Sequence, residues 1–302
     1  MNIQDVEPYG YIVGASNLKH FEYVRPSSLK KACHLIKHPK GKSYVLAGGT
    51  DLLVQIKKRC VFPKMIVSLR DIPGLSFIRS IPDAGLSIGA MTTLSALESS
   101  ELLQKEFKAI ANAAGTIGSV QVRNRATVGG NLCNASPSAD MAPILLAYDA
   151  RVVISDGARN RTVSLENFFT GSGCTALNNG EILKEIIIPP SERPSFAIYL
   201  KAYRSKMDIA LVGVALFISF KPNTKSCRDI RIALGAVAST PIRARMAEKI
   251  AIGSKLENSL IKRICIAVNK EAIPISDVRA SATYRRTLVG FLTKKALKSA
   301  MG

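Results

Sequence analysis

Two pairs of adjacent glycines are the residues best suited to holding a ligand in this sequence. The first pair, Gly48-Gly49, lies in "LAGGTDLL", where a β-like run passes into an amphipathic run. Glycines at such a turn permit positive φ and leave backbone N–H groups accessible, an arrangement suited to a phosphate. The pair is equally compatible with a turn that needs glycine for its conformation alone.

The second pair, Gly129-Gly130, lies in "ATVGGNLCNASPSAD" at residues 126–140 and is followed by amide and hydroxyl side chains. The polarity and the chain-breaking residues of this stretch predict that it lies outside the core. Together, two glycine turns about eighty residues apart could hold the two halves of a pyrophosphate. The alternative is a set of Asx and Ser turns leading into a helix capped by Ser138 or Asp140.

Neither pair belongs to a G-x-G-x-x-G or a G-x-x-x-x-G-K motif, and neither motif occurs elsewhere in the chain. A nucleotide, if one is bound, is therefore held in another way. The three histidines, His20, His34 and His38, lie outside the glycine motifs. We assign them no catalytic role, and we predict no metal site.

Local patterns predict the elements that position the first pair. Apolar spacing indicates a helix in "SLKKACHLIKH", and a strand over residues 44–47 leads through the glycines into a helix that begins at Thr50 or Asp51. Short strands are predicted in "MIVSLRD", "LSFIRSI" and "GLSIGA", after which Thr92 or Thr93 caps a helix.

Helices in "ELLQKEFKAIANAAGTIG" and "ADMAPILLAYDA" flank the second pair, and strands follow in "RVVISD" and "GEILKEIIIPP". A different texture begins near residue 191. Three long β-like runs, "SFAIYLKAYR", "DIALVGVALFISF" and "DIRIALGAVAST", precede helical segments at 246–252, 256–271 and 281–300. Three strands followed by helices indicate a separate α+β domain, with its boundary in the proline-containing "IIIPPSERPS".

Composition limits the class of protein. The chain has 302 residues, of which 47% are hydrophobic, as is typical of globular proteins. Lys and Arg outnumber Asp and Glu by 42 to 22, giving a formal charge of +20 that will attract an acidic protein, a nucleic acid, an anionic lipid or a phosphate ligand. The basic residues are dispersed and no zinc-finger or RNA-recognition motif occurs, which argues against nucleic acid.

The six cysteines are widely separated and form no C-x-x-C pair, so we expect reduced thiols and a cytoplasmic protein. The first twenty residues lack the basic start and apolar run of a secretion signal. The longest apolar stretch, "IALVGVALFISF", is shorter than the roughly 20 residues that a membrane span needs. We therefore predict no membrane span.

Three motifs in this order, "LAGGTDLL", "TVGGNLCNASPSADMAP" and "YLKAYRSKMDIALVGVAL", resemble the FAD-binding subunits of the molybdenum hydroxylases, such as the carbon monoxide dehydrogenase medium chain and the xanthine dehydrogenase FAD domain. "GAVASTPIRARMAE" and "SATYRRTLVGFLTKKAL" resemble the C-terminal domain of that family. The resemblance runs from about residue 21 to the end of the chain, and residues 1–20 form an N-terminal extension.

The resemblance implies an α+β fold. Residues 21–190 would form a vanillyl-alcohol-oxidase-like (PCMH-type) FAD-binding domain of two α/β subdomains, a small one at about 21–75 and a larger one at about 76–190. Residues 191–302 would form an α+β C-terminal domain with a three-stranded sheet and helices, like that of the carbon monoxide dehydrogenase flavoprotein.

The resemblance also implies which residues bind FAD. Asp140 matches the acid that closes the site, and Lys201 matches a basic contact near the pyrimidine edge of the flavin. Without that match, Lys201 could equally be a solvated lysine on an edge strand. The full set implied is Leu46, Ala47, Gly48, Gly49, Thr50, Asp51, Ile117, Ala126, Thr127, Val128, Gly129, Gly130, Asn131, Asp140, Leu183 and Lys201.

The implied function is electron transfer by FAD in an oxidoreductase subunit, with no catalytic side chain. Electrons would pass from iron-sulfur clusters to NAD, a quinone or another acceptor. Since the chain has neither the cysteine spacing nor the length for iron-sulfur and molybdopterin sites, we expect an iron-sulfur subunit and a molybdopterin subunit as partners, in a heterotrimer or a dimer of heterotrimers. Much of the +20 charge is then expected to dock an acidic partner and to balance the FAD diphosphate. The alternatives are a stand-alone FAD-dependent reductase of the same fold and a basic nucleic-acid-binding module.

Overall fold

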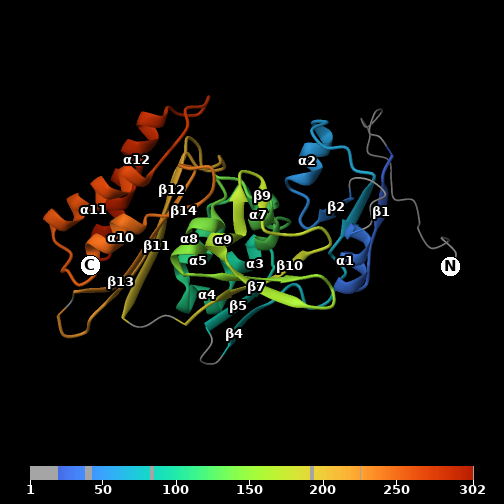
Figure 1. The fold of residues 1–302 in the computed structure, drawn as a ribbon, viewed down its shortest axis with the longest axis horizontal. Coiled ribbons are helices and arrows are strands. Elements are labelled where there is room, and N and C mark those ends of the chain that lie inside the picture. Colours follow the sequence, from blue (N-terminus) through green and yellow to red (C-terminus); the bar gives the residue numbers. More distant parts are fainter. Residues whose placement is uncertain (1–19, 38–42, 82–84, 191–193, 225, 302) are drawn as a thin grey trace.

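The computed structural model describes residues 20–37, 43–81, 85–190, 194–224 and 226–301, and its helices and strands form three units in chain order (Figure 1). The N-terminal unit lies at one end of the molecule and the C-terminal unit at the other (Figure 1). Residues 1–20, the predicted extension, lie almost entirely outside the described residues. Within the described ranges, no helix has the length and apolar character that crossing a membrane requires.

The N-terminal unit is a small parallel sheet in the order β1-β3-β2, formed by β1 (Glu22–Val24), β2 (Ser43–Leu46) and β3 (Met65–Ser68). Its helices are α1 (Leu29–Lys37) and α2 (Leu52–Lys57). The apolar face of α1 packs Ala32 and Cys33 against Val67 of β3. The predicted helix and strand of this region are confirmed, with α2 beginning one or two residues later than expected.

The central unit has an antiparallel sheet in the order β4-β5-β10-β6-β7. Its strands are β4 (Ile78–Ile81), β5 (Gly85–Gly89), β6 (Arg151–Ser155), β7 (Asn160–Ser164) and β10 (Ile182–Ile188). The last strand in sequence is the middle strand of the sheet, which suits its apolar run "ILKEIII". A short hairpin, β8 (Phe169–Gly171) and β9 (Cys174–Thr175), precedes it.

In the described part of the central unit, seven short helices cover this sheet: α3 (Leu94–Ser99), α4 (Glu101–Glu106), α5 (Lys108–Gly115), α6 (Val120–Arg123), α7 (Val128–Cys133), α8 (Met141–Ala147) and α9 (Leu165–Phe168). Thr93 caps α3 by accepting a hydrogen bond from the Ala96 amide at 3.2 Å. Of the two predicted caps, Thr92 and Thr93, the second is therefore the one observed.

The expectation that residues 126–140 lie outside the core is wrong. The stretch contains α7, every residue in it is buried or half-buried, and Val128 and Leu132 are fully buried.

The C-terminal unit has the antiparallel strands β11 (Ser195–Ala202), β12 (Val212–Phe220), β13 (Cys227–Gly235) and β14 (Ile242–Arg243), followed by α10 (Arg245–Ala251), α11 (Asn258–Glu271) and α12 (Ala282–Ser299). The predicted three-stranded sheet is therefore wrong by one strand. The two residues of β14 give too short a pattern to recognise, and their pairing with β13 at Ala233 and Leu234 makes them a strand.

The two faces of this sheet belong to different cores. Alternate residues of β12 separate accordingly, with Ala215 and Phe217 packing against the central unit, and Val214 and Leu216 packing against α10, α11 and α12. This alternation has the two-residue period of a β-strand. The buried helix α8 lies between the central helices and the C-terminal sheet, so the two units share one hydrophobic core.

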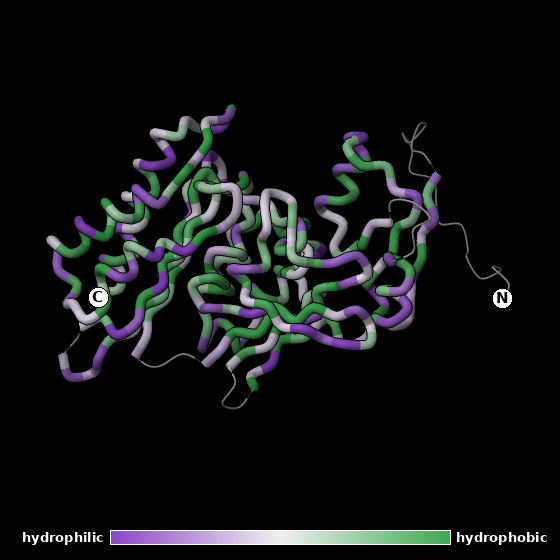
Figure 2. The backbone as a smooth tube through the Cα atoms, viewed as in Figure 1, coloured by the Kyte–Doolittle hydropathy of each residue, from purple (hydrophilic) through white to green (hydrophobic). Residues whose placement is uncertain are grey.

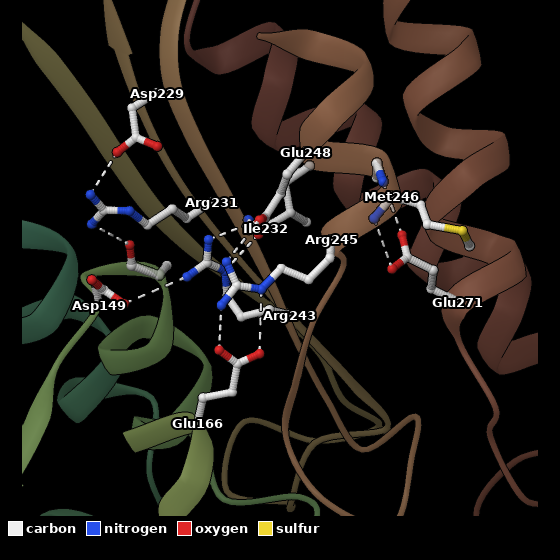
Figure 3. A network of polar contacts seen from close by, with 12 residues as sticks. Asp149, Glu166, Asp229, Arg231, Ile232, Arg243, Arg245, Met246, Glu248 and Glu271 are labelled. Carbon is white, nitrogen blue, oxygen red and sulfur yellow. Dashed lines mark hydrogen bonds and ion pairs between the residues drawn. The ribbon is translucent and has the colours of Figure 1, made fainter. Parts of the chain in front are cut away.

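Polar contacts join the same two units at the edge of this core (Figure 3). Arg245 forms an ion pair with Glu166 of α9, and Arg231 donates a hydrogen bond to the Ala147 carbonyl oxygen at 3.4 Å. Within the C-terminal unit, Arg243 binds both carboxylate oxygens of the buried Glu248, at 2.6 and 2.8 Å, and its guanidinium also lies 3.9 Å from Asp149 of the central unit. The orientation of the C-terminal unit is therefore set by packing and by charge together.

Candidate functional site

A cleft of about 710 Å³ lies where the three units meet. Its walls come from the β2–α2 loop, from the segment around α7, from β10 and from the end of β11 with the loop that follows. Its volume falls within the range of cofactor sites. The predicted site residues that line it are Ala47, Gly48, Gly49, Thr50, Asp51, Ile117, Ala126, Thr127, Gly129, Gly130, Asn131, Asp140, Leu183 and Lys201. Leu46 ends β2 and the fully buried Val128 begins α7, and neither lines the cleft.

The first glycine loop presents free backbone amides. Among the described residues, the N–H groups of residues 48–51 have no protein acceptor. The loop needs its glycines for two separate reasons. Gly49 has φ of 81°, a conformation that favours glycine. At Gly48, an added Cβ atom would lie 2.1 Å from the Arg125 carbonyl oxygen, so no side chain fits there.

The second glycine loop is built differently, because its amides are already bonded inside the protein. The amides of Val128 and Gly129 donate to the carbonyl oxygens of Thr92 and Ala90, at 3.0 and 2.8 Å. The Gly130 amide donates to the Thr127 hydroxyl at 3.0 Å, which caps α7. A Cβ atom at Gly129 would lie 2.6 Å from Ala90, so this glycine permits close packing of α7 against the segment that follows β5.

Side chains that follow the second loop face the cleft in place of amides. Asn131, Asn134, Ser136 and Ser138 all line it. The Asn131 Oδ1 atom is buried and has no hydrogen-bond partner among the described residues. A buried amide oxygen normally has a partner, so this atom indicates a donor that the chain itself does not supply.

Asp140 and Lys201 form a buried ion pair across the cleft. The Lys201 Nζ atom lies 2.9 Å from Asp140 Oδ2 and donates to the Thr116 carbonyl oxygen at 3.1 Å. The Lys201 side chain is 2% exposed and the Asp140 side chain 6%. Although β11 is an edge strand, the alternative of a solvated lysine on that strand is therefore wrong. Burial raises the pKa of Asp140, and the Lys201 ammonium and the Tyr199 hydroxyl oppose that rise.

Tyr199 is a site residue that the sequence did not reveal. Its hydroxyl donates to Asp140 Oδ1 at 2.7 Å, and burial together with the Asp140 charge raises the pKa of the phenol well above 10. Tyr199 and Lys201 are two residues apart on β11, so they lie on the same face of the strand. The two-residue spacing from Lys201 was the sequence signal that could have revealed Tyr199. Only the tertiary contact with Asp140 shows that Tyr199 belongs to the site.

The charge of the cleft differs from expectation. Its described lining carries four carboxylates, those of Asp51, Asp140, Glu181 and Asp208, and one ammonium, that of Lys201. The expectation that much of the +20 charge balances the FAD diphosphate is therefore wrong for the described lining of the cleft. Glu181 is paired with Arg161 from outside the lining, at 2.8 Å, and this contact lowers the pKa of Glu181 to about 2.

Comparison with known proteins identifies the class. Residues 19–191 match the family model of the FAD binding domain in molybdopterin dehydrogenase, and residues 197–300 match that of the CO dehydrogenase flavoprotein C-terminal domain. The chain belongs to the family of FAD-binding subunits of molybdenum-containing dehydrogenases, as the sequence motifs predicted.

Individual relatives agree with this assignment. The chain is 36% identical over 278 residues to the glyceraldehyde dehydrogenase medium chain of Sulfolobus acidocaldarius, covering 92% of this chain and 97% of the relative. It is 34% identical over 282 residues to the xanthine dehydrogenase FAD-binding subunit of Escherichia coli O157:H7, covering 92% and 95%. The structure matches a chain of carbon monoxide dehydrogenase from Hydrogenophaga pseudoflava with a TM-score of 0.90 and 32% identity, covering 94% and 98%.

The cleft fits FAD, the cofactor of this family. A diphosphate has only acceptor oxygens, and the first loop offers four consecutive amides that lack protein acceptors. The unpaired Asn131 oxygen can accept from a hydroxyl group such as those of a ribityl chain. The absence of an arginine from the described lining is compatible with this fit, because backbone amides can hold phosphate without a formal charge.

Proposed function

We propose that this chain is the FAD-binding subunit of a multi-subunit molybdenum hydroxylase. In this role it passes electrons between the iron-sulfur clusters of a partner subunit and an external acceptor such as NAD or a quinone. The observation that carries the proposal is the meeting in one cleft of the first glycine loop, the side chains after the second loop, and the Asp140–Lys201 pair. Family membership supports the same reading.

The finer fold assignment belongs to the same proposal. A PCMH-type, vanillyl-alcohol-oxidase-like FAD domain would comprise a small subdomain at about 21–75 and a larger one at about 76–190. The break between β3, which ends at Ser68, and β4, which begins at Ile78, supports this division. Residues 191–302 would form the C-terminal domain, which reaches back into the site through Tyr199 and Lys201.

Each part of the cleft has a distinct role in this proposal. The amides of residues 48–51 would hold the diphosphate, and Asn131 with the neighbouring serines would hold the ribityl hydroxyls. Ile117 and Leu183 would contact the ring system as apolar walls. When bound, FAD supplies two-electron redox chemistry, so the protein need supply no catalytic acid, base or nucleophile.

Asp140 and Lys201 would set the electrostatic environment of the ring. As an ion pair they add no net charge to the site, so Lys201 does not act as an isolated cation. Its effect on the reduction potential therefore depends on the protonation state of Asp140. Tyr199 keeps the carboxylate in position by hydrogen bonding to its second oxygen.

The partners follow from the same proposal. An iron-sulfur subunit and a molybdopterin subunit would complete the enzyme as a heterotrimer or a dimer of heterotrimers in the cytoplasm. All six cysteines are free thiols, at positions 33, 60, 133, 174, 227 and 265. Burial raises the pKa of Cys133, which lines the cleft, to about 12, so this thiol stays protonated and unreactive at neutral pH.

The test is to purify the tagged chain from its own organism under mild conditions. We expect a yellow protein that releases FAD, and not FMN, on denaturation, together with partner chains that contain iron and molybdenum. The recombinant chain alone should bind FAD at one per chain. Colourless protein that cannot be reconstituted with FAD would rule out the proposal.

A further inference from the structure

Exposed apolar side chains gather on two adjoining loops, one of which, the β11–β12 loop, borders the cleft. The β11–β12 loop carries Tyr203, Met207 and Ile209, which are 47%, 65% and 56% exposed. The α11–α12 loop carries Ile273, Ile275 and Val278, which are 72%, 72% and 99% exposed. We name these six side chains the apolar rim. Met207 and Ile209 also line the cleft, so the rim is continuous with the candidate cofactor site.

Buried polar contacts hold the two loops together. Arg285, at the start of α12 and 1% exposed, donates to the carbonyl oxygens of Leu211 and Ala236, at 2.6 and 3.3 Å. It also binds Asp277 at 2.8 Å, and the Ile273 amide donates to the Val237 carbonyl oxygen at 2.8 Å. The rim is therefore preformed, and its exposed side chains are displayed by a braced backbone.

The tip of the α11–α12 loop stands out from the body of the protein (Figure 1), and Figure 2 shows hydrophobic residues at that tip. A side chain that is 99% exposed contributes nothing to the core of this chain. Scattered surface apolar residues are ordinary, but a clustered set beside a cofactor site marks an interaction surface.

The charge around the rim selects the kind of partner. Apart from the buried Arg285, residues 203–209 and 273–286 contain four basic residues and two acidic residues, and both acids, Asp208 and Asp277, are paired with arginines of the same segments. A second copy of a chain with a charge of +20 would be repelled here. A different protein with an apolar patch surrounded by carboxylates fits this surface.

We propose that the apolar rim is the docking surface for the subunit that exchanges electrons with the flavin, and that the facing surface of that subunit is apolar and acidic. This inference rests on the proposed function. Contact at the rim would place the partner directly over the cleft mouth, and it would bury the side chains that this chain alone leaves in water.

The experiment replaces rim residues that lie outside the cleft, so that FAD binding is unaffected. Ile275→Glu and Val278→Glu put an acidic charge on the surface, and Val278→Lys makes a matched change of opposite charge. The control is Ile252→Glu. Ile252 is 53% exposed and adjoins the Cys227 end of β13, roughly 30 Å from the rim by the length of that strand.

Each tagged variant is purified from its own organism, and FAD and iron are measured per chain. We expect all variants to keep FAD. Ile275→Glu and Val278→Glu should lower the iron content at least tenfold, Val278→Lys should lower it less, and Ile252→Glu should leave it unchanged. Retained iron in the Glu variants, or equal loss in the control, overturns the docking surface.

Two further outcomes are decisive. Equal loss with Val278→Lys and Val278→Glu would overturn the acidic character of the partner. A change in the oligomeric mass of the isolated chain on substitution of the rim would show that a second copy is the occupant, which also overturns the proposal. Wild-type protein that carries FAD but no iron would instead contradict the proposed function, so the two failures are distinguishable.

Discussion

The two glycine loops look alike in sequence and do different work in the structure. In the described part of the chain, the loop at Gly48-Gly49 leaves four consecutive amides without protein acceptors, whereas the loop at Gly129-Gly130 uses its amides to attach α7 to the segment after β5 and to cap that helix. The first loop can hold an anion with its backbone. The second positions side chains, from Asn131 to Asp140, that face the same cleft. A glycine pair therefore indicates close approach of the backbone to other atoms. Whether its amides are hydrogen-bonded within the protein decides whether they can bind a ligand.

The largest expected effect tests the buried ion pair between Asp140, which follows the second loop, and Lys201 of β11. Lys201→Met and Asp140→Asn each leave one member of a buried ion pair without its partner. We expect each to lower the free energy of unfolding by about 3–5 kcal/mol, measured by urea denaturation of the FAD-free chain. A loss below about 1 kcal/mol in both variants would show that the pair is effectively solvated.

The cost of Lys201→Met should depend on pH. Burial already raises the pKa of Asp140, and loss of the ammonium raises it further. Because the folded-state pKa then lies above the unfolded value, the variant is most stable below the unfolded pKa and loses stability as the pH rises through the folded one. The deficit relative to wild type should thus be greater at pH 8 than at pH 5. A deficit independent of pH would contradict this account.

The substitutions Asp140→Asn and Lys201→Met should shift the flavin reduction potential in opposite directions. Asp140→Asn leaves an extra positive charge, which favours the anionic reduced flavin and raises the potential. Lys201→Met lowers the potential where Asp140 is ionised, and the difference should shrink as the pH falls and Asp140 takes up a proton. Redox titration at equal FAD occupancy measures both. Shifts of the same sign would contradict the pairing seen in the structure.

Gly48→Ala tests the close approach of the first loop to the chain just before the second. The new Cβ atom would overlap the Arg125 carbonyl oxygen, at 2.1 Å, so the two segments must separate. We expect a loss of about 3 kcal/mol in unfolding free energy and loss of FAD. Gly171→Ala is the control, because Gly171, like Gly48, does not have positive φ, and an added Cβ there would meet only the Cys174 Cβ atom, at 3.7 Å. Equal stability of the two variants would show that the loop relaxes freely.

Gly130→Val should separate FAD binding from folding. Gly130 does not have positive φ. Among the described residues, an added Cβ atom would meet only the Thr127 hydroxyl, at 2.9 Å, and the Ala47 methyl group, at 3.6 Å. The larger side chain would fill space in the cleft. We expect stoichiometric FAD to be lost with only about 1 kcal/mol of destabilisation. Full FAD content in the variant would remove this part of the loop from the site.

Thr127→Ala gives the smallest expected effect and completes the comparison. It removes the same cap that valine at position 130 disturbs, but it leaves the cleft open. The Thr127 hydroxyl accepts from the Gly130 amide, so any FAD contact at this position is expected to come from the backbone. We therefore expect a loss of about 1 kcal/mol in unfolding free energy and unchanged FAD content. FAD loss in Thr127→Ala equal to that in Gly130→Val would show that the cap, and not the occupied space, governs binding.

Local patterns were sufficient wherever one element carries its own periodicity. The helix at Leu29–Lys37, the run of strand β10 and the three long strands of the C-terminal unit were all predicted from spacing alone. The family motifs identified the cofactor class, because the combination of three motifs in order is specific. The four-residue strands β2 and β3 were predicted from their apolar composition, whereas β14, with two residues, and α6, with four, were missed, since so short a segment has no period of its own.

By itself, therefore, the sequence determined the main elements, the family and the residues that meet in the cleft. Only the tertiary structure decided which amides stay free, that the polar stretch 126–140 packs inside, and that Lys201 is neutralised by Asp140 with Tyr199 beside it. The physical reason is that hydrogen-bond satisfaction, burial and ion pairing depend on segments distant along the chain. Asp140 and Lys201 are 61 residues apart, and neither position alone reveals the other.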